Sequence, residues 1–201
     1  MGVDIVILDG ARTAIGTFGG SLSAIPPTAL AAHASRVALE RAGVAPEQVG
    51  QVVFGHVINT EPRDMYLSRV AAIEAGVPDD TPAMNVNRLC GSGAQAIASA
   101  AQALALGDAE FALAGGAECM SRSPYAMQAI RWGQKMGDAT AVDMMVGALT
   151  CPFGTGHMGV TAENVAAENQ ITREDQDAFA VESQRRALAA IEGGRFDSQI
   201  A

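Results

Sequence analysis

A cysteine directly precedes a glycine-rich turn near the middle of the chain. Cys90 stands immediately before Gly91 and Gly93, and residues 95–106, which are almost all small and apolar, predict a helix behind them. The unpaired backbone N–H groups and the positive dipole end of such a helix would face the thiol. That position favours the reactive thiolate form of cysteine. The pattern therefore indicates a nucleophile at Cys90.

If Cys90 is a nucleophile, the two glycines have a clear purpose. Without a Cβ, Gly91 and Gly93 let a substrate approach the backbone closely. The N–H groups of the turn can also bind the oxyanion that forms on an acyl carbonyl. We therefore assign both glycines to clearance and oxyanion binding.

Two other interpretations of this turn stay open from the residues alone. Cys90 is also typical of a small apolar side chain in a core. The two glycines and Ala96 match the G-x-G-x-x-A spacing of a dinucleotide-binding oxidoreductase. That turn requires a buried strand before it and an acidic residue after the next strand. Residues 85–89 are half polar, which disfavours a nucleotide site, although Glu118 stands where the acid is needed.

The elements that must position the cysteine alternate between strands and helices. Short apolar runs predict buried strands, and apolar residues at helical spacing predict the helices between them. The expected strands are 4–8, 52–54, 83–86 and 111–114, and the expected helices are 28–42, 64–75, 95–106, 161–168 and 172–192. This alternation is typical of an α/β protein whose mostly parallel sheet is covered on both faces.

The texture of the chain changes after residue 119. Residues 121–159 are rich in glycine, methionine and turn residues, and two helices follow. The second helix begins at Thr172, where Asp175 takes the acidic position of a capping box. We therefore expect a core domain over residues 1–119 and a more irregular loop domain over residues 120–201.

The composition excludes several classes of protein. The formal net charge is -9, so the overall field of the chain does not attract nucleic acid. Three cysteines without a C-x-x-C pair argue against a metal site and a disulfide framework, and free thiols suit a reducing cytosol. We see no secretory signal and no uninterrupted apolar stretch long enough to span a bilayer. We expect a cytoplasmic protein that binds neither nucleic acid nor membrane.

Residues 87–93, Asn-Arg-Leu-Cys-Gly-Ser-Gly, resemble the acyl-enzyme motif of the thiolases. Other segments resemble the family in the same order along the chain, and the resemblance covers essentially all 201 residues. These segments are Ala-Arg-Thr-Ala-Ile-Gly at 11–16, Ala-Gly-Gly-Ala-Glu at 114–118 and His-Met-Gly-Val-Thr-Ala-Glu-Asn-Val-Ala at 157–166. Residues 60–67 are most similar to bacterial β-ketothiolases that also accept acyl groups longer than acetyl.

This resemblance implies both a fold and an activity. The fold would be a layered α-β-α domain with a mixed, mostly parallel sheet, followed by part of a loop domain. The activity would be reversible Claisen condensation and thiolysis of acyl-CoA and 3-ketoacyl-CoA, with Cys90 carrying the acyl group. Coenzyme A thioesters would be the substrates, and no further cofactor is implied. Family comparison places Leu149, His157 and Met158 against the pantetheine arm and thioester of CoA.

The resemblance also implies partners for this chain. Similar thiolases are dimers or tetramers, and residues 131–141 resemble their tetramer-contact loop. They also have a second, similar half that supplies a Gly-His-Pro histidine, a second cysteine and an asparagine, and these motifs do not occur here. We expect the chain to be the first half plus part of the loop domain, inactive without the C-terminal half. The alternative is a non-catalytic, half-length acyl-CoA-binding or assembly module.

Overall fold

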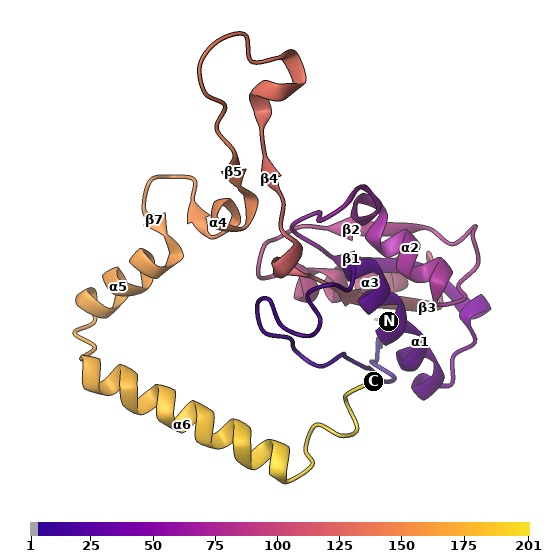
Figure 1. Ribbon diagram of the computed structural model, residues 1–201. Helices are drawn as coiled ribbons and strands as arrows, with labels where there is room; N and C mark the ends of the chain where they lie inside the picture. The colour runs from indigo at the N-terminus through magenta and orange to yellow at the C-terminus, as the bar shows by residue number, and fades with distance from the viewer. Residues whose placement is uncertain (1–3) are drawn as a thin grey trace.

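An α/β unit occupies residues 27–116 of the computed structural model, which describes residues 4–201 (Figure 1). Its elements are α1 (Pro27–Ala42), β1 (Val49–Gly55), α2 (Leu67–Glu74), β2 (Ala83–Val86), α3 (Ser92–Leu106) and β3 (Phe111–Gly116), with the short 3-10 helices η1 (Pro46–Gln48) and η2 (Pro62–Tyr66) between them. The strands form a parallel sheet in the order β2-β1-β3. This arrangement confirms the predicted α/β class.

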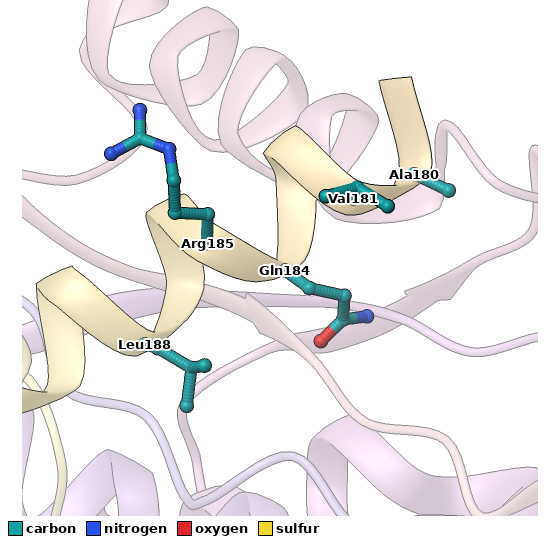
Figure 2. A pocket seen from close by; sticks show the side chains of 5 residues that line it. All are labelled: Ala180, Val181, Gln184, Arg185 and Leu188. Atoms are coloured by element: carbon teal, nitrogen blue, oxygen red, sulfur yellow. The ribbon is translucent and has the colours of Figure 1, made fainter. Parts of the chain in front are cut away.

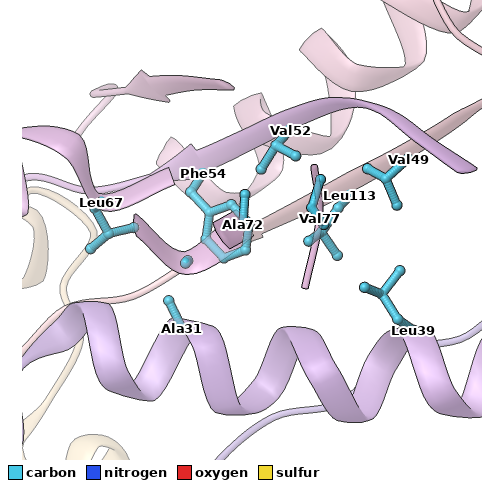
Figure 3. Packing of buried hydrophobic residues seen from close by; sticks show 10 residues of the cluster. Ala31, Leu39, Val49, Val52, Phe54, Leu67, Ala72, Val77 and Leu113 are labelled. Atoms are coloured by element: carbon cyan, nitrogen blue, oxygen red, sulfur yellow. The ribbon is translucent and has the colours of Figure 1, made fainter. Parts of the chain in front are cut away.

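Successive side chains of β1 point to opposite faces of the sheet and divide the core into two clusters. Val52 and Phe54 pack with residues of α1 and α2 on one face (Figure 3). Val53 packs with Ala96 and Ala100 of α3 on the other face. The unit is therefore an α-β-α sandwich, as the resemblance implies.

The boundaries of the predicted elements hold to within a few residues, with two informative shifts. The helix behind the cysteine begins at Ser92 rather than Gln95, because the turn at Gly91 leads directly into it. The helix expected from residue 64 begins at Leu67, because Pro62–Tyr66 first forms a 3-10 turn whose N-terminus is capped by the Asp64 carboxylate.

The predicted strand over residues 4–8 is wrong for this structure. Residues 5–8 are between 39% and 80% exposed, and within residues 4–201 no strand supplies them with ladder hydrogen bonds. An apolar run becomes a strand only when a neighbour pairs with its backbone groups. The nearest pairing is the isolated parallel bridge between Arg12 and Ile200.

The apolar helix predicted at 95–106 is buried on one face only. Its inner face packs on β1 and β3, but Ile97 is 49% and Leu106 79% exposed. The sheet covers one side of α3, and no described element covers the other. By length and composition alone, the 18-residue window Leu89–Leu106, with a mean hydropathy of 1.2, is apolar enough to cross a membrane. This is weak support for a membrane helix, because core helices of soluble proteins pass the same test.

Residues 120–201 form a series of short helices and strands, followed by the long helix α6, that arches away from the α/β unit (Figure 1). They are η3 (Met120–Arg122), β4 (Tyr125–Ala126), η4 (Gln128–Trp132), β5 (Val142–Asp143), α4 (Met144–Ala148), β6 (Thr150–Cys151), β7 (Gly156–His157), α5 (Met158–Glu168) and α6 (Arg173–Glu192). The pairs β4–β5 and β6–β7 are antiparallel. The division of the chain into two domains at residue 119 stays a prediction.

Two sets of hydrogen bonds stabilise this second region, one within it and one between its last residues and the α/β unit. Thr172 caps α6 with the predicted capping box, in which its hydroxyl accepts from the Asp175 N–H at 3.1 Å and the Asp175 carboxylate accepts from the Thr172 N–H at 3.2 Å. After α6 the chain returns to the α/β unit, where the Arg41 guanidinium donates to the carbonyls of Ser198 (2.7 Å) and Ile200 (3.0 Å). The last residues therefore lie beside α1 and the N-terminal segment.

Candidate functional site

Cys90 lies in the turn between β2 and α3, at the edge of the sheet where the parallel strands end. The thiol residue is exposed, and Gly91 is the N-cap of α3. Cys90 is therefore not a core residue. It lies at the N-terminus of a helix with one buried face, at the position that the sequence predicts. The interpretation of Cys90 as a structural core cysteine is wrong.

The backbone of this turn is closed by its own hydrogen bonds. The Gly91 N–H donates to the Arg88 carbonyl and the Ser92 N–H to the Leu89 carbonyl, both at 3.0 Å. These two N–H groups are thus already used within the turn. A Cβ on Gly93 would meet no described atom within 4 Å, so this glycine faces open space. The assignment of Gly91 and Gly93 to clearance and oxyanion binding stays a prediction.

A close approach of two backbones fixes where α3 begins. A Cβ on Gly55, the last residue of β1, would lie 2.6 Å from the Ser92 carbonyl carbon and 2.9 Å from the Gly93 nitrogen. Such distances are far below van der Waals contact. The absence of a side chain at Gly55 therefore lets the first turn of α3 rest directly on the sheet.

Glu118 fixes the loop that follows β1. Its carboxylate accepts hydrogen bonds from the N–H groups of Val57 (2.9 Å) and Ile58 (3.1 Å). The neighbouring His56 is buried, and its Nδ1 lies 2.9 Å from the Ala117 carbonyl oxygen. Because both oxygens of Glu118 are engaged with backbone, the acid that a dinucleotide site needs for ribose is not available. This geometry argues against the oxidoreductase interpretation.

The residues predicted to contact CoA gather on one hairpin. Leu149 ends α4, His157 ends β7, and Met158 begins α5. The Met158 N–H donates to the Leu149 carbonyl at 2.8 Å, which holds these positions together. The exposed His157 is the N-cap of α5, and its Nδ1 accepts from the Gly159 N–H at 3.0 Å. The proton of the neutral ring therefore sits on Nε2, which is left as an outward donor.

The structure does not bring the CoA hairpin and Cys90 together. Within residues 4–201 no hydrogen bond or ion pair joins the turn 87–92 to residues 149–158. In Figure 1, α3 lies in the α/β unit while β7 and α5 lie on the arching segment. The assignment of Leu149, His157 and Met158 to CoA stays a prediction.

The other two cysteines differ from Cys90 and from each other. Cys119 is buried, with its Sγ near the carbonyls of Leu22 and Ser23. Cys151 is half-buried at the end of β6, where the Thr155 hydroxyl donates to its Sγ at 3.3 Å. This bond, with smaller contributions from backbone N–H groups of the same turn, lowers the pKa of the Cys151 thiol below its ordinary value.

Surface depressions elsewhere do not contain Cys90. One lies along a single exposed face of α6, formed by Ala180, Val181, Gln184, Arg185 and Leu188 (Figure 2). Because all its side chains come from one helix, it encloses nothing. A second depression, between α5 and the start of α6, includes Met158 and Ile171. Among the described residues no cluster of histidine, cysteine and carboxylate side chains is arranged to hold a metal ion.

Sequence reasoning missed the residues that support the cysteine. Asn87 and Ser92 make side-chain bonds across the turn, and Gly55 and Glu118 hold the neighbouring loop and strand end. Asparagine two residues before a left-handed position and serine at the first position of a helix are local signals of such bonds. The contacts of Gly55 and Glu118 depend on pairing between distant segments and leave no local signal.

Comparison with known proteins identifies the family. Residues 5–201 match the family described as the N-terminal domain of thiolase. The chain belongs to the thiolase family. The resemblance found in the sequence is therefore confirmed, together with the fold that it implies.

Similar thiolases come from bacteria and from animals. Beta-ketothiolase BktB of Cupriavidus necator is 60% identical over 98% of this chain and 50% of its own length. An acetyl-CoA acetyltransferase of the same organism is 51% identical over 98% of this chain and 50% of its own. The chain thus spans about half the length of the curated relatives it matches.

Solved thiolase structures share the fold. The acetyl-CoA acetyltransferase of Bacillus anthracis is 43% identical, with a TM-score of 0.93 over 98% of this chain and 50% of its own. Human mitochondrial 3-ketoacyl-CoA thiolase, solved in complex with CoA, is 37% identical, with a TM-score of 0.93 over 96% of this chain and 50% of its own.

Proposed function

We propose that this chain provides the acyl-accepting part of a thiolase, with Cys90 as the nucleophile. The observation that carries the proposal is the exposed Cys90 thiol on a closed turn at the N-terminus of α3, in a chain of the thiolase family. The positive end of the helix dipole favours negative charge at this point. Cys90 is therefore the residue best placed to attack a thioester.

The proposed reaction proceeds through a covalent intermediate. The Cys90 thiolate attacks the carbonyl of an acyl-CoA, a carbon–sulfur bond forms to Sγ, and CoA leaves with the electron pair of the broken bond and takes up a proton. A second acyl-CoA, deprotonated at its α-carbon, then attacks the acyl-cysteine. The product is a 3-ketoacyl-CoA, and the thiolate is released. Thiolysis runs the same steps in reverse.

The hairpin that carries Leu149, His157 and Met158 is the proposed contact with the pantetheine arm. Leu149 and Met158 offer apolar surface, and Met158 is 42% exposed. Because Nδ1 of His157 accepts a hydrogen bond from the Gly159 N–H, the ring can donate its Nε2–H to a carbonyl oxygen of the arm.

Partners and location follow from the same proposal. The group that deprotonates the second acyl-CoA is expected on the C-terminal half of the same enzyme. A dimer or tetramer in the cytoplasm is proposed, with the exposed apolar side chains of Trp132 (86%) and Met136 (90%) at the tip between β4 and β5 as contacts between copies. Metabolism of fatty acids or of polyhydroxybutyrate is the proposed setting.

The experiment that tests the proposal is mass spectrometry of the full chain after incubation with acetyl-CoA. An acetyl group on the peptide that contains Cys90, absent from Cys90→Ser, is the expected result. Mixing the chain with a fragment that carries the C-terminal half should restore thiolysis of a 3-ketoacyl-CoA. Acetylation without restored thiolysis would favour the alternative, a non-catalytic acyl-CoA-binding or assembly module, and no acetylation would refute the nucleophile.

A further inference from the structure

The residue before Cys90 has an unusual backbone conformation. Leu89 has a φ of 47°, in the left-handed region that residues other than glycine seldom adopt. Among the described residues only Gln170 shares this property outside glycine. A leucine stays in this region only when surrounding contacts impose it. The conformation of Leu89 sets the direction in which the next residue, Cys90, leaves the turn.

The hydroxyl of Ser92 supplies two of these contacts. Its Oγ accepts a hydrogen bond from the Arg88 N–H at 2.9 Å and donates one to the Leu89 carbonyl at 2.6 Å. The side chain thus bonds to the backbone on the other side of Cys90. Ser92 is only 5% exposed, wedged against Gly55 of β1, so the hydroxyl is anchored to the sheet as well as to the helix.

Asn87 supplies a third contact from the opposite side. Its Oδ1 accepts from the Leu89 N–H at 3.1 Å, and its Nδ2 lies 3.5 Å from the Val57 carbonyl. Glu118 in turn holds Val57 through the backbone N–H. Both the N–H and the C=O of Leu89 are therefore bonded to side chains that belong to rigid neighbours.

We propose that Ser92 and Asn87 are positioning residues for Cys90, which hold Leu89 in its left-handed conformation and so keep the thiol at the N-terminus of α3. The proposal rests on the role of Cys90 as nucleophile. The effect of Ser92 and Asn87 is on the rate at which Cys90 reacts, because a fixed turn holds Sγ in one position for attack.

The test measures the reactivity of Cys90 relative to another thiol of the same molecule. The full chain is treated with iodoacetamide, and the labelling rates of Cys90 and Cys151 are read from their peptides. Cys151 is the internal standard because its turn shares no bond with Ser92. Ser92→Ala should lower the ratio of the two rates about tenfold, the effect of losing a buried bonded hydroxyl. Ser35→Ala, the same change at a buried serine of α1 whose hydroxyl bonds to no residue of the turn, should leave the ratio unchanged.

A second readout separates positioning from loss of structure. In Ser92→Ala the maximal rate of Cys90 acetylation by acetyl-CoA should fall, while the acetyl-CoA concentration that gives half the maximal rate stays the same. A merely structural role would move both values and the melting temperature together. In denaturant the labelling ratio of parent and variant should be equal, because there the turn no longer exists.

The outcomes are decisive in either direction. A folded Ser92→Ala protein whose labelling ratio stays within twofold of the parent, or rises, overturns the proposal. If Ser92→Ala does not fold, Asn87→Ala decides, since Asn87 is exposed and its replacement leaves the core intact. A labelling ratio of Asn87→Ala equal to that of the parent would also overturn the proposal. Failure of the parent chain to be acetylated would refute the proposed function, whereas the iodoacetamide ratio would still judge the positioning residues.

Discussion

Replacing Gly55 by alanine should disturb the nucleophile through the direct contact between β1 and the first turn of α3. The added Cβ would lie 2.6 Å from the Ser92 carbonyl carbon, 2.8 Å from the Ser92 Cβ and 2.9 Å from the Gly93 nitrogen. Two of these are backbone atoms of α3, which cannot move aside as a flexible side chain can. Either β1 or the first turn of α3 must shift, and the turn that holds Cys90 shifts with α3.

The cost can be estimated from other cases of overpacking. Forcing an extra methyl group into a packed interior costs about 1–3 kcal/mol. For a chain of about this size, each kcal/mol lowers the melting temperature by roughly 2–4 °C. Gly55→Ala should therefore melt about 2–12 °C below the parent and label more slowly at Cys90. Circular dichroism and thiol labelling measure the two effects.

Gly10→Ala is the matched control. Its added Cβ would meet no described atom within 4 Å, and Gly10 is not at a positive φ. The control should melt and label like the parent. If Gly55→Ala also behaves like the parent, the close approach between β1 and α3 does not position the cysteine, and the reasoning fails.

Four further predictions rest on individual side chains. Because the Thr155 hydroxyl lowers the pKa of Cys151, its thiolate persists to lower pH than that of an ordinary cysteine; Thr155→Val should move the half-maximal pH of Cys151 alkylation upward, and an unchanged profile would contradict this. Buried Cys119 should label only in denaturant. Glu118→Gln, which gives up one of two acceptors for backbone N–H groups, should cost about 1–3 kcal/mol in urea unfolding. Thr172→Ala should cost roughly 1 kcal/mol by uncapping α6, seen as lost helicity; equal helicity would show that the cap is dispensable.

The order of thiol reactivity is less simple than the sequence indicates. From the sequence we expect Cys90 to be alkylated faster than both Cys119 and Cys151. Burial of Cys119 supports half of that expectation. The Thr155 hydroxyl, however, lowers the pKa of the Cys151 thiol, so the labelling rates of Cys90 and Cys151 should be compared at several pH values.

Elements whose signals are local were predictable from the sequence. The helix over 28–42 is bounded by proline at its start and a left-handed Gly43 at its end, and the structure has it at Pro27–Ala42. The strand at 83–86 and the cap at Thr172 also agree. In each case the residues that decide the structure lie within or beside the element.

Features that depend on distant partners were not predictable. Residues 5–8 have the composition of a strand. A strand also requires a neighbouring segment that pairs with its backbone groups, and such a partner leaves no signal within residues 5–8. The outer face of α3 is a similar case. The sequence shows that Ile97 is apolar, but its exposure depends on elements that lie elsewhere in the chain. The side chains that support Cys90 belong to both groups. Asn87 and Ser92 bond to backbone within the same turn, whereas Glu118 bonds to the loop after a different strand.

The contacts that present Cys90 lie within residues 55–118. None of those contacts involves the hairpin of His157 or the tip between β4 and β5. The proposed capture of an acyl group therefore depends on contacts within residues 55–118, whereas the proposed contact with CoA lies on the hairpin of His157. A change that loosens the CoA hairpin should raise the acetyl-CoA concentration needed for acetylation and leave iodoacetamide labelling of Cys90 unchanged. A change at Gly55, Asn87 or Ser92 should do the reverse, so the two assays together assign any variant to the nucleophile or to the binding of its substrate.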